Sequence, residues 1–429
     1  MSAALAMTVV SAPAAMARPS AQPADSISKG SVVPASLFGM HIYNAEVGSW
    51  PTIPVGAFRL WDTRTTWSTI EPVKGQFNWS TLDTAVATSK ANGVNDILMV
   101  LAGTPLWASK DPSAGGLAGV LPGAAGMPTN IADWDNWVTQ VATRYKGKIT
   151  SYQIWNEANL TTFSTGSADE MADLTKHAYD IIKKIDPSAL VVAPSTGTRL
   201  GGPFMKFYPA YLKGLKDRGW PIDVFAAHTY PASLGTPVDR AGLAKKWIAV
   251  LKAAGAPAKP LWDTENNLGL KGPGPLNPDV DIEGEKAADW VGRTYLDSIR
   301  LGLSRTYWYR WEPDNDLWGI QMYTGTPGAE AFKTLEDWIV GATYNGCTTK
   351  AGNVKCNFTK GGKPFVVLYT DSGSPKQFKV SGSYSQECSL DGICKAMTGK
   401  SIVTNGPVRL SNEQQPAPTR PVGPPRKSR

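Results

Sequence analysis

The chain has 429 residues, of which 42% are hydrophobic, and its formal net charge is +7. This length exceeds the roughly 250 residues of a (β/α)8 barrel and leaves room for a smaller second domain. The positive charge is not concentrated in a basic helix, so we expect no nucleic-acid partner. No segment approaches the roughly 20 apolar residues that a membrane span needs, so we expect no membrane span.

The N-terminal stretch, residues 1–30, is expected to be either the remnant of an export signal or a disordered terminus. It is small and apolar at first and then becomes rich in Ala, Pro and Ser. Ala15-Met16-Ala17 resembles the small-residue cleavage site of a secretory signal, although the basic start of such a signal is missing. We therefore expect a protein that is secreted or held in the cell envelope.

Between residues 31 and 341, amphipathic helices alternate with short apolar runs. One helix begins with the capping box Ser167 and Glu170 and ends at Asp186-Pro187. This alternation predicts an α/β fold with a parallel sheet, and eight such units favour a closed (β/α)8 TIM barrel over an open sheet. No Gly-x-Gly-x-x-Gly loop follows the first run, which counts against a dinucleotide-binding oxidoreductase. The predicted strands are Leu37–His41, Ala57–Leu60, Ile97–Leu101, a run ending at Trp155, Leu190–Pro194, Val224–His228, Pro260–Trp262 and Thr306–Trp311.

After residue 341 the pattern changes to short alternating runs separated by Gly, Ser and Asp-Gly turns, which predicts a small C-terminal antiparallel β domain over residues 342–411. All four cysteines lie in this stretch. Pairing of Cys347 with Cys356 and of Cys388 with Cys394 is the simplest of three connectivities, and it supports export. A zinc site fits the cysteine spacing poorly. Residues 412–429 are rich in Pro and basic residues and are expected to form a disordered tail.

Two glutamates each follow one of the apolar runs of the barrel. Glu157 ends the string Ile154-Trp155-Asn156-Glu157, and Glu265 ends Leu261-Trp262-Asp263-Thr264-Glu265. The carboxyl ends of the strands carry the active site in such barrels, and three strand–helix units separate the two glutamates, so we expect them to face one pocket. Hydrolysis of a glycosidic bond needs two carboxylates, one that donates a proton and one that attacks. The pattern therefore predicts a glycosidase site that needs no metal or cofactor, without saying which glutamate takes which role.

An ordered set of six motifs in this sequence resembles the retaining (β/α)8 glycoside hydrolases whose acid/base follows strand 4 and whose nucleophile follows strand 7. The sequence is most similar to glycoside hydrolase family 39 and its bacterial exopolysaccharide-hydrolase relatives, over roughly residues 35 to 340. The motifs are Arg59-Leu60-Trp61, Trp67…Glu71-Pro72…Gly75-Gln76-Phe77-Asn78-Trp79, Gly103-Thr104-Pro105…Trp107, Trp155-Asn156-Glu157, His228-Thr229-Tyr230 and Thr264-Glu265.

The resemblance implies a role for each matching residue. Glu157 would be the general acid/base and Glu265 the nucleophile of a double displacement on an oligosaccharide or polysaccharide. Six further residues would bind the substrate. Arg59 would also hold Glu265, and Asn156 would bond the sugar 2-hydroxyl. His228 and Tyr230 would line the pocket, and Trp308 or Trp311 would form the sugar platform.

Other interpretations of these residues remain open at the level of sequence. Either glutamate can be a salt-bridge partner of an arginine, His228 can be a core histidine, and each tryptophan can belong to the core. We expect a structural role for Glu71 and expect Asp62 and Asp263 to point away from the site, whereas Glu312 and Asp314 can touch substrate. The alternative function is a non-catalytic carbohydrate-binding protein of the cell envelope on a hydrolase scaffold. The sequence does not identify the sugar, the cleavage mode or the oligomeric state.

Overall fold

The structure, a computed structural model, describes residues 26–116, 121–271, 278–312, 317–372, 374–380 and 384–412. Most of the predicted export-signal stretch (residues 1–25) and nearly all of the predicted tail (residues 413–429) lie outside these ranges. Within the described ranges, no helix is both long enough and apolar enough to cross a membrane.

Eight parallel strands form one sheet in the order β7-β6-β3-β2-β1-β10-β9-β8. The two end strands are joined by parallel bridges from Val192 to Val224 and from Gly197 to His228, which close the sheet into a barrel. The predicted (β/α)8 barrel is therefore confirmed. Its strands are β1 (Phe38–Ile42), β2 (Ala57–Leu60), β3 (Ile97–Leu101), β6 (Ser151–Ile154), β7 (Leu190–Val192), β8 (Phe225–His228), β9 (Leu261–Asn266) and β10 (Leu303–Trp311).

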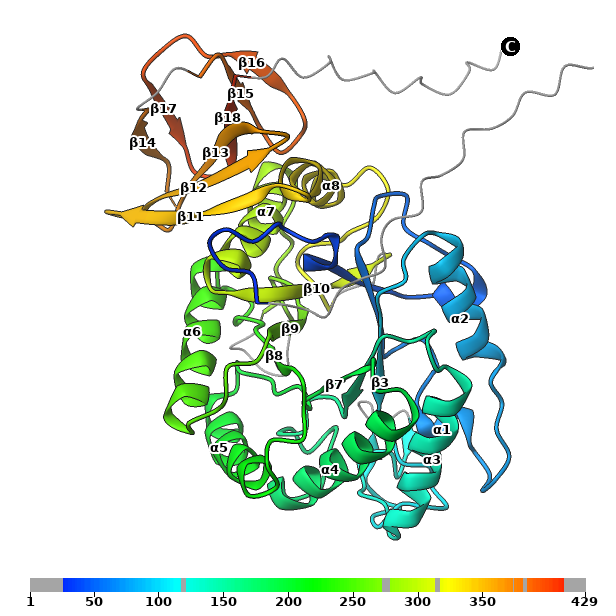
Figure 1. The fold of residues 1–429 in the computed structure, drawn as a ribbon. Helices are drawn as coiled ribbons and strands as arrows, with labels where there is room; N and C mark the ends of the chain where they lie inside the picture. The colour runs from blue at the N-terminus through cyan, green and yellow to red at the C-terminus, as the bar shows by residue number, and fades with distance from the viewer. Residues whose placement is uncertain are drawn as a thin grey trace, which may run out of the picture.

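Helices surround the barrel, and from β2 onward an α-helix lies between each barrel strand and the next (Figure 1). The capping box of Ser167 and Glu170 starts α4, as predicted. The connection from β1 to β2 differs from the expected pattern, because its Gly- and Pro-rich residues form only the 3-10 turn η2 (Ala45–Val47). The helices are α1 (Trp67–Ile70), α2 (Ser80–Ala91), α3 (Ile131–Arg144), α4 (Ala168–Ile185), α5 (Gly201–Asp217), α6 (Pro237–Ala253), α7 (Gly284–Arg300) and α8 (Pro327–Ile339).

The barrel interior is divided between an apolar plug and a polar end. The plug consists of inward-facing side chains, with Trp262 and Tyr307 as its largest members, and it fills the amino-terminal part of the barrel. Toward the carboxyl end of the strands the inward positions become polar, and fully buried Arg59 and Gln153 take the place of apolar side chains. Since a buried charge needs partners, this polar end must contain a connected hydrogen-bond network.

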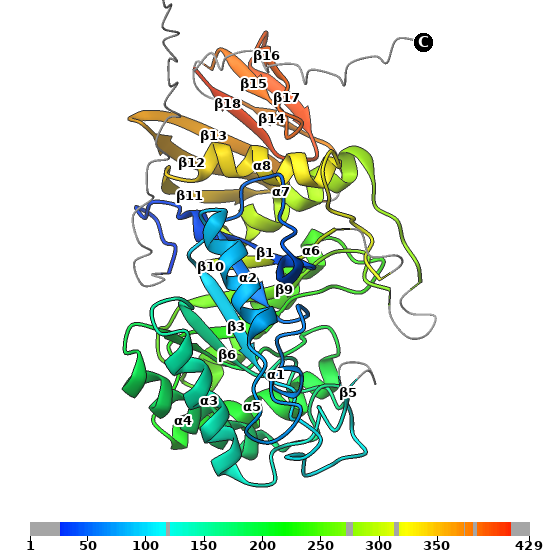
Figure 2. The same ribbon diagram turned by 90° about the vertical axis from the view of Figure 1, so that its right-hand side faces the viewer.

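The C-terminal β domain is built on a six-stranded antiparallel sheet and contains both predicted disulfides. Each disulfide joins residues that are paired across neighbouring strands, Cys347 to Cys356 and Cys388 to Cys394. Figure 2 shows this domain on the outside of the barrel, beside α7 and α8. Its strands are β11 (Thr343–Lys350), β12 (Asn353–Lys360), β13 (Lys363–Thr370), β14 (Lys376–Lys379), β15 (Gln386–Cys388), β16 (Cys394–Ala396), β17 (Ser401–Thr404) and β18 (Val408–Ser411).

The N-terminal segment before β1 pairs with the start of the β domain. Val32 bridges Thr343 in the antiparallel sense, and the amide of Val33 donates to the carbonyl of Ala342 over 2.9 Å. The barrel sheet ends before residue 341 and the C-terminal sheet begins after it, as expected. The segment that precedes β1 nevertheless pairs with β11, the first strand of the C-terminal sheet.

Candidate active site

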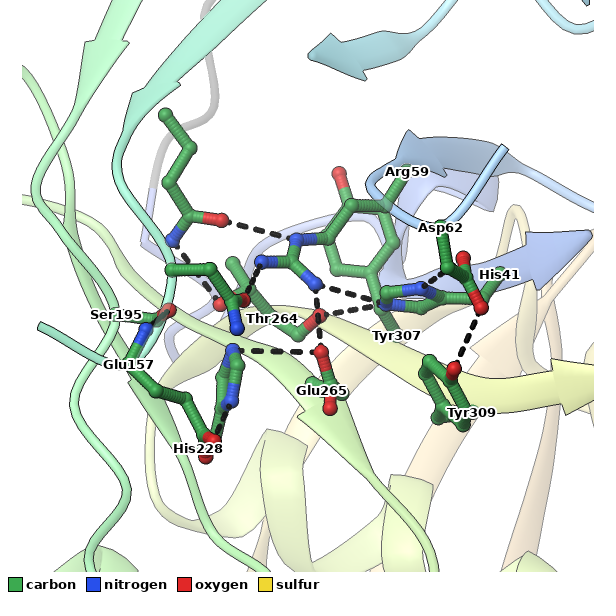
Figure 3. A network of polar contacts seen from close by, with 12 residues as sticks. His41, Arg59, Asp62, Glu157, Ser195, His228, Thr264, Glu265, Tyr307 and Tyr309 are labelled. Atoms are coloured by element: carbon green, nitrogen blue, oxygen red, sulfur yellow. Dashed lines mark hydrogen bonds and ion pairs between the residues drawn. The ribbon is translucent and has the colours of Figure 1, made fainter. Parts of the chain in front are cut away.

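Arg59 is the centre of the polar network at the carboxyl end of the barrel (Figure 3). Its side chain is fully buried, and it donates from Nη1 to Glu265 Oε2 over 2.8 Å and from Nη2 to Asn156 Oδ1 over 2.8 Å. The remaining nitrogen, Nε, donates to Gln153 Oε1 over 2.9 Å. One guanidinium group thus links the ends of β2, β6 and β9. It needs these partners because a buried cation whose N–H groups lack acceptors would be strongly destabilising.

The Glu265 carboxylate is held from two sides. Arg59 contacts Oε2, and the hydroxyl of Tyr230 donates to Oε1 over 2.9 Å. The side chain is 9% exposed, so one part of it still faces the opening of the barrel. Burial and the negative charge of Glu265 raise the pKa of Tyr230 well above its usual value, which keeps the phenol a hydrogen-bond donor. The two donors fix the orientation of a carboxylate that remains accessible.

Glu157 lies on a sharp turn directly after β6. Trp155 and Glu157 have φ values of 71° and 41°, in the left-handed region that non-glycine residues rarely occupy. The amide of Glu157 donates to Ser195 Oγ over 3.1 Å, which helps to hold this conformation. Burial raises the pKa of Glu157 to about 7, although Arg199 and Arg59 act in the opposite direction. A carboxyl group with this pKa can release a proton near neutral pH and take it back.

His228, at the end of β8, lies between the two carboxyl groups (Figure 3). Its Nδ1 is 3.1 Å from Glu157 Oε1, and its Nε2 is 3.8 Å from Glu265 Oε2. Burial lowers the pKa of His228 to about 3, against the pull of Glu265, so the ring is neutral near neutral pH. The two glutamates singled out in the sequence are therefore brought to opposite edges of one imidazole ring.

Three further residues of the network did not stand out as site residues in the sequence. His41 is the last residue but one of β1, and its Nε2 lies 3.2 Å from Arg59 Nη1, while its Nδ1 is 3.7 Å from Asp62 Oδ1. Tyr309 of β10 donates to Asp62 Oδ2 over 2.5 Å. Burial alone would raise the pKa of Asp62, but His41 and Tyr309 together hold it well below its usual range. The expectation that Asp62 points away from the site is wrong, because the loop after β2 turns its side chain back over the barrel end.

The predicted sugar platforms do not reach the carboxylates. Trp308 is fully buried and Trp311 is 3% exposed, and both belong to the large hydrophobic cluster shared with the surrounding helices. The tryptophan beside the site is Trp318, in the loop after β10. Its ring stacks on Tyr230 with centroids 5.5 Å apart and lies 4.6 Å from the ring of Tyr309. Strand alternation explains the outward direction of Trp308, because its neighbours Tyr307 and Tyr309 face inward. The register between β1 and β10 shifts between Trp308 and Trp311, so this alternation does not extend to Trp311.

The other acidic residues considered in the sequence have mostly structural partners. Glu71 is fully buried and accepts from the Trp67 indole over 2.7 Å, in agreement with its predicted structural role. Asp263 is fully buried and pairs with Arg240 at 2.6 Å, outside the network. Glu312 accepts from Asn44 over 2.8 Å and from Ser49 over 2.5 Å. Asp314 lies outside the described residues. Within the described ranges, no group of three or more His, Cys, Asp or Glu side chains is arranged to hold a metal ion.

Comparison with known proteins agrees with the barrel fold. Residues 62–231 match the sequence model of Glycosyl hydrolase family 10. A β-xylosidase from Caldicellulosiruptor saccharolyticus is 28% identical over 205 residues, which are 42% of this chain and only 38% of the xylosidase. A family 39 glycoside hydrolase from Bacteroides cellulosilyticus WH2 superposes with a TM-score of 0.66 at 16% identity, over 88% of this chain and 81% of that protein. A family 39 β-xylosidase from Caulobacter crescentus superposes with a TM-score of 0.61 at 16% identity, over 90% and 97% of the two chains.

The chain has the (β/α)8 barrel fold and is similar in sequence and in structure to (β/α)8 glycoside hydrolases. The family 39 structures share the barrel fold that the resemblance seen in the sequence implies, while the sequence model that matches is that of family 10. At these low identities the superpositions show a shared fold only. The site of this chain is described by its own contacts around Arg59 and His228.

Proposed function

We propose that the protein is an exported, retaining glycoside hydrolase that cleaves O-glycosidic bonds by double displacement, with Glu157 as acid/base and Glu265 as nucleophile. The observation that carries the proposal is the placement of both carboxyl groups against His228, 3.1 Å and 3.8 Å from its two ring nitrogens. The different surroundings of the two glutamates support the assignment of roles. Glu265 is paired with a cation, whereas burial raises the pKa of Glu157 to about 7.

In the first step, Glu157 gives its proton to the glycosidic oxygen while the bond from that oxygen to the anomeric carbon breaks. Glu265 attacks the same carbon from the other face, and a covalent glycosyl–enzyme ester forms. The amide of Asn156 is oriented for this step, because its Oδ1 accepts from Arg59 and its Nδ2 is left to donate to a sugar hydroxyl. The charge that develops on the sugar ring is stabilised by the fixed Glu265 carboxylate.

In the second step, the ionised Glu157 removes a proton from a water molecule, which attacks the anomeric carbon and releases Glu265. Two inversions give net retention of configuration. The substrate class is a poly- or oligosaccharide, and β-xylosides are the first candidates because the matched relatives include β-xylosidases. Export is supported by the two disulfides of the β domain, since such bonds persist in oxidising compartments.

The test compares Glu157→Gln, Glu265→Gln and the control Glu312→Gln on aryl β-glycosides and on xylo-oligosaccharides. Glu312 also lies at the end of a barrel strand, but its carboxylate is bound by Asn44 and Ser49. On xylo-oligosaccharides we expect both site variants to lose at least roughly 1,000-fold in kcat/KM and the control to keep the wild-type value, and on activated aryl glycosides we expect the large loss for Glu265→Gln only. Thermal unfolding of all three variants should match that of the wild type.

The two roles are separated with azide as an external nucleophile. The Glu157→Ala variant should be rescued by azide on an activated aryl glycoside and give a glycosyl azide of retained configuration, and Glu265→Ala should give the inverted azide. NMR of the first-formed product of the wild type should show retention. Full activity of Glu265→Gln would refute the assignment, and sugar binding without any hydrolysis would favour the non-catalytic alternative.

A further inference from the structure

The backbone of Gly197, in the loop after β7, forms one wall of the Glu157 carboxyl site. A Cβ atom placed on Gly197 would lie 2.9 Å from Glu157 Oε1 and 3.6 Å from its carboxyl carbon. The φ angle of Gly197 is not in the left-handed region, so the backbone itself does not require glycine here. What requires glycine is the space that the carboxyl group of Glu157 occupies.

This wall is fixed from two directions. The side chain of Asn159 donates from Nδ2 to the carbonyl of Gly197 over 3.0 Å and accepts the amide of Gly197 at Oδ1 over 2.9 Å. On the other side the backbone of His228 bonds to both neighbours of Gly197, through its amide to Thr196 over 3.0 Å and through its carbonyl to Thr198 over 3.1 Å. The peptide at Gly197 therefore has little freedom to move.

The same loop also holds the backbone of the turn that carries Glu157. Ser195 accepts the amide of Glu157 at Oγ over 3.1 Å and the amide of Ala158 at its carbonyl over 3.1 Å. Asn159 follows Glu157 by two residues, so a single short turn supplies both the carboxyl group and the side chain that fixes its wall. The Glu157 carboxyl group is thus enclosed between the Gly197 backbone and the His228 ring, which is 3.1 Å away.

We infer that Gly197 and Asn159 are positioning residues for the acid/base: the Asn159 side chain locks the Gly197 peptide, and that peptide sets where the Glu157 carboxyl group stands relative to the leaving oxygen. This inference rests on the proposed function. Neither residue needs to touch the substrate. A displaced carboxyl group would still be present and titratable, but it would protonate the leaving group less well.

The size of the effect follows from the geometry. A methyl group 2.9 Å from Glu157 Oε1 must push that oxygen away, since Cβ atoms in proteins essentially never lie closer than 3.0 Å to another heavy atom. A shift of this order in a reacting group costs roughly 10- to 100-fold in rate. The loss falls on the step that needs a proton, so it should be large for a disaccharide with a poor leaving group and small for a dinitrophenyl glycoside, whose leaving group departs without protonation.

The experiment measures kcat and KM of Gly197→Ala, Asn159→Ala and Gly202→Ala with both kinds of substrate, with Glu157→Gln in the same series. Gly202 is the matched control, because a Cβ there would meet nothing within 4 Å and its φ is also outside the left-handed region. We expect Gly197→Ala to lose about 10- to 100-fold in kcat on the disaccharide, to change less than about threefold on the activated glycoside and to keep its KM. Asn159→Ala should show the same selective loss at about two- to tenfold.

The two proposals fail in different ways. If Glu157→Gln retains wild-type activity on the disaccharide, the proposed function is wrong. If Glu157→Gln is inactive and Gly197→Ala behaves like Gly202→Ala, or loses activity equally on both substrates with an unchanged pH profile, the positioning role is wrong. Asn159→Ala keeps the inference testable if Gly197→Ala does not fold, because it adds no atoms to the site.

Discussion

The basic limb of the pH–rate profile can be assigned to one residue. Burial raises the pKa of Glu157 from 4.5 to about 7. At about pH 6 a carboxyl group with that pKa is about 90% protonated, compared with about 3% for an ordinary glutamate. Burial therefore increases the working concentration of the acid by about 30-fold at this pH. We expect kcat/KM on a disaccharide to fall about tenfold per pH unit above about pH 7.5 and to level off as the pH is lowered to about 6.

The groups next to Glu157 titrate far from neutral pH, so the basic limb can be assigned to Glu157. Burial lowers the pKa of His228 to about 3, and the pKa of Tyr230 lies well above its usual value. The assay is an initial-rate series at constant ionic strength, repeated with Glu157→Gln, in which the limb near neutral pH should disappear along with most of the activity. A basic limb below about pH 5.5, or the same limb in Glu157→Gln, would show that Glu157 is not the titrating acid.

Three further predictions concern separate parts of the molecule. Tyr230→Phe removes a 2.9 Å hydrogen bond to Glu265, so kcat/KM should fall roughly 10- to 100-fold with an unchanged melting temperature; wild-type kinetics would contradict a role in orienting the carboxylate. Burial, with Glu285 nearby, raises the pKa of Asp289 to about 7. The wild type should therefore lose on the order of 1–2 kcal/mol of stability as the pH rises from about 4 through 7, while Asp289→Asn should not. If the melting temperatures of the two proteins change in parallel over this range, the prediction is wrong. Replacing Cys388 and Cys394 by serine opens a short loop and should cost about 2–3 kcal/mol in denaturant unfolding of the β domain, without altering kcat of the barrel.

The sequence was sufficient for the barrel because its signals are local and repeated. The structure contains the predicted capping box of Ser167 and Glu170 and the predicted alternation of helices with buried strands. The pairing of Glu157 with Glu265 was also predictable, because strand order alone brings the ends of β6 and β9 to one face of the barrel. The same rule applied to β1 would have pointed to His41, which lies near the carboxyl end of a buried strand.

Side-chain direction was not predictable at the eighth strand. A run of aromatic residues gives no sign of which members face inward, and both candidate platforms, Trp308 and Trp311, lie in the outer core. Trp318 reaches the site through the loop after β10, whose path depends on tertiary contacts with Tyr230 and Tyr309. Asp62 was misplaced for a related reason, because alternation along a strand does not continue into the loop that follows it.

The segment before β1 pairs in the antiparallel sense with residues 341–344, and this pairing limits where the chain can be shortened. The amide of Gly341 donates to Val33 and the amide of Tyr344 donates to Ser31, over 2.9 Å and 2.8 Å. A truncation immediately after residue 341 would remove the partner strand of the chain's own entry into the barrel and leave an unpaired edge beside the first barrel strand. A shortened protein that keeps the barrel should therefore retain β11.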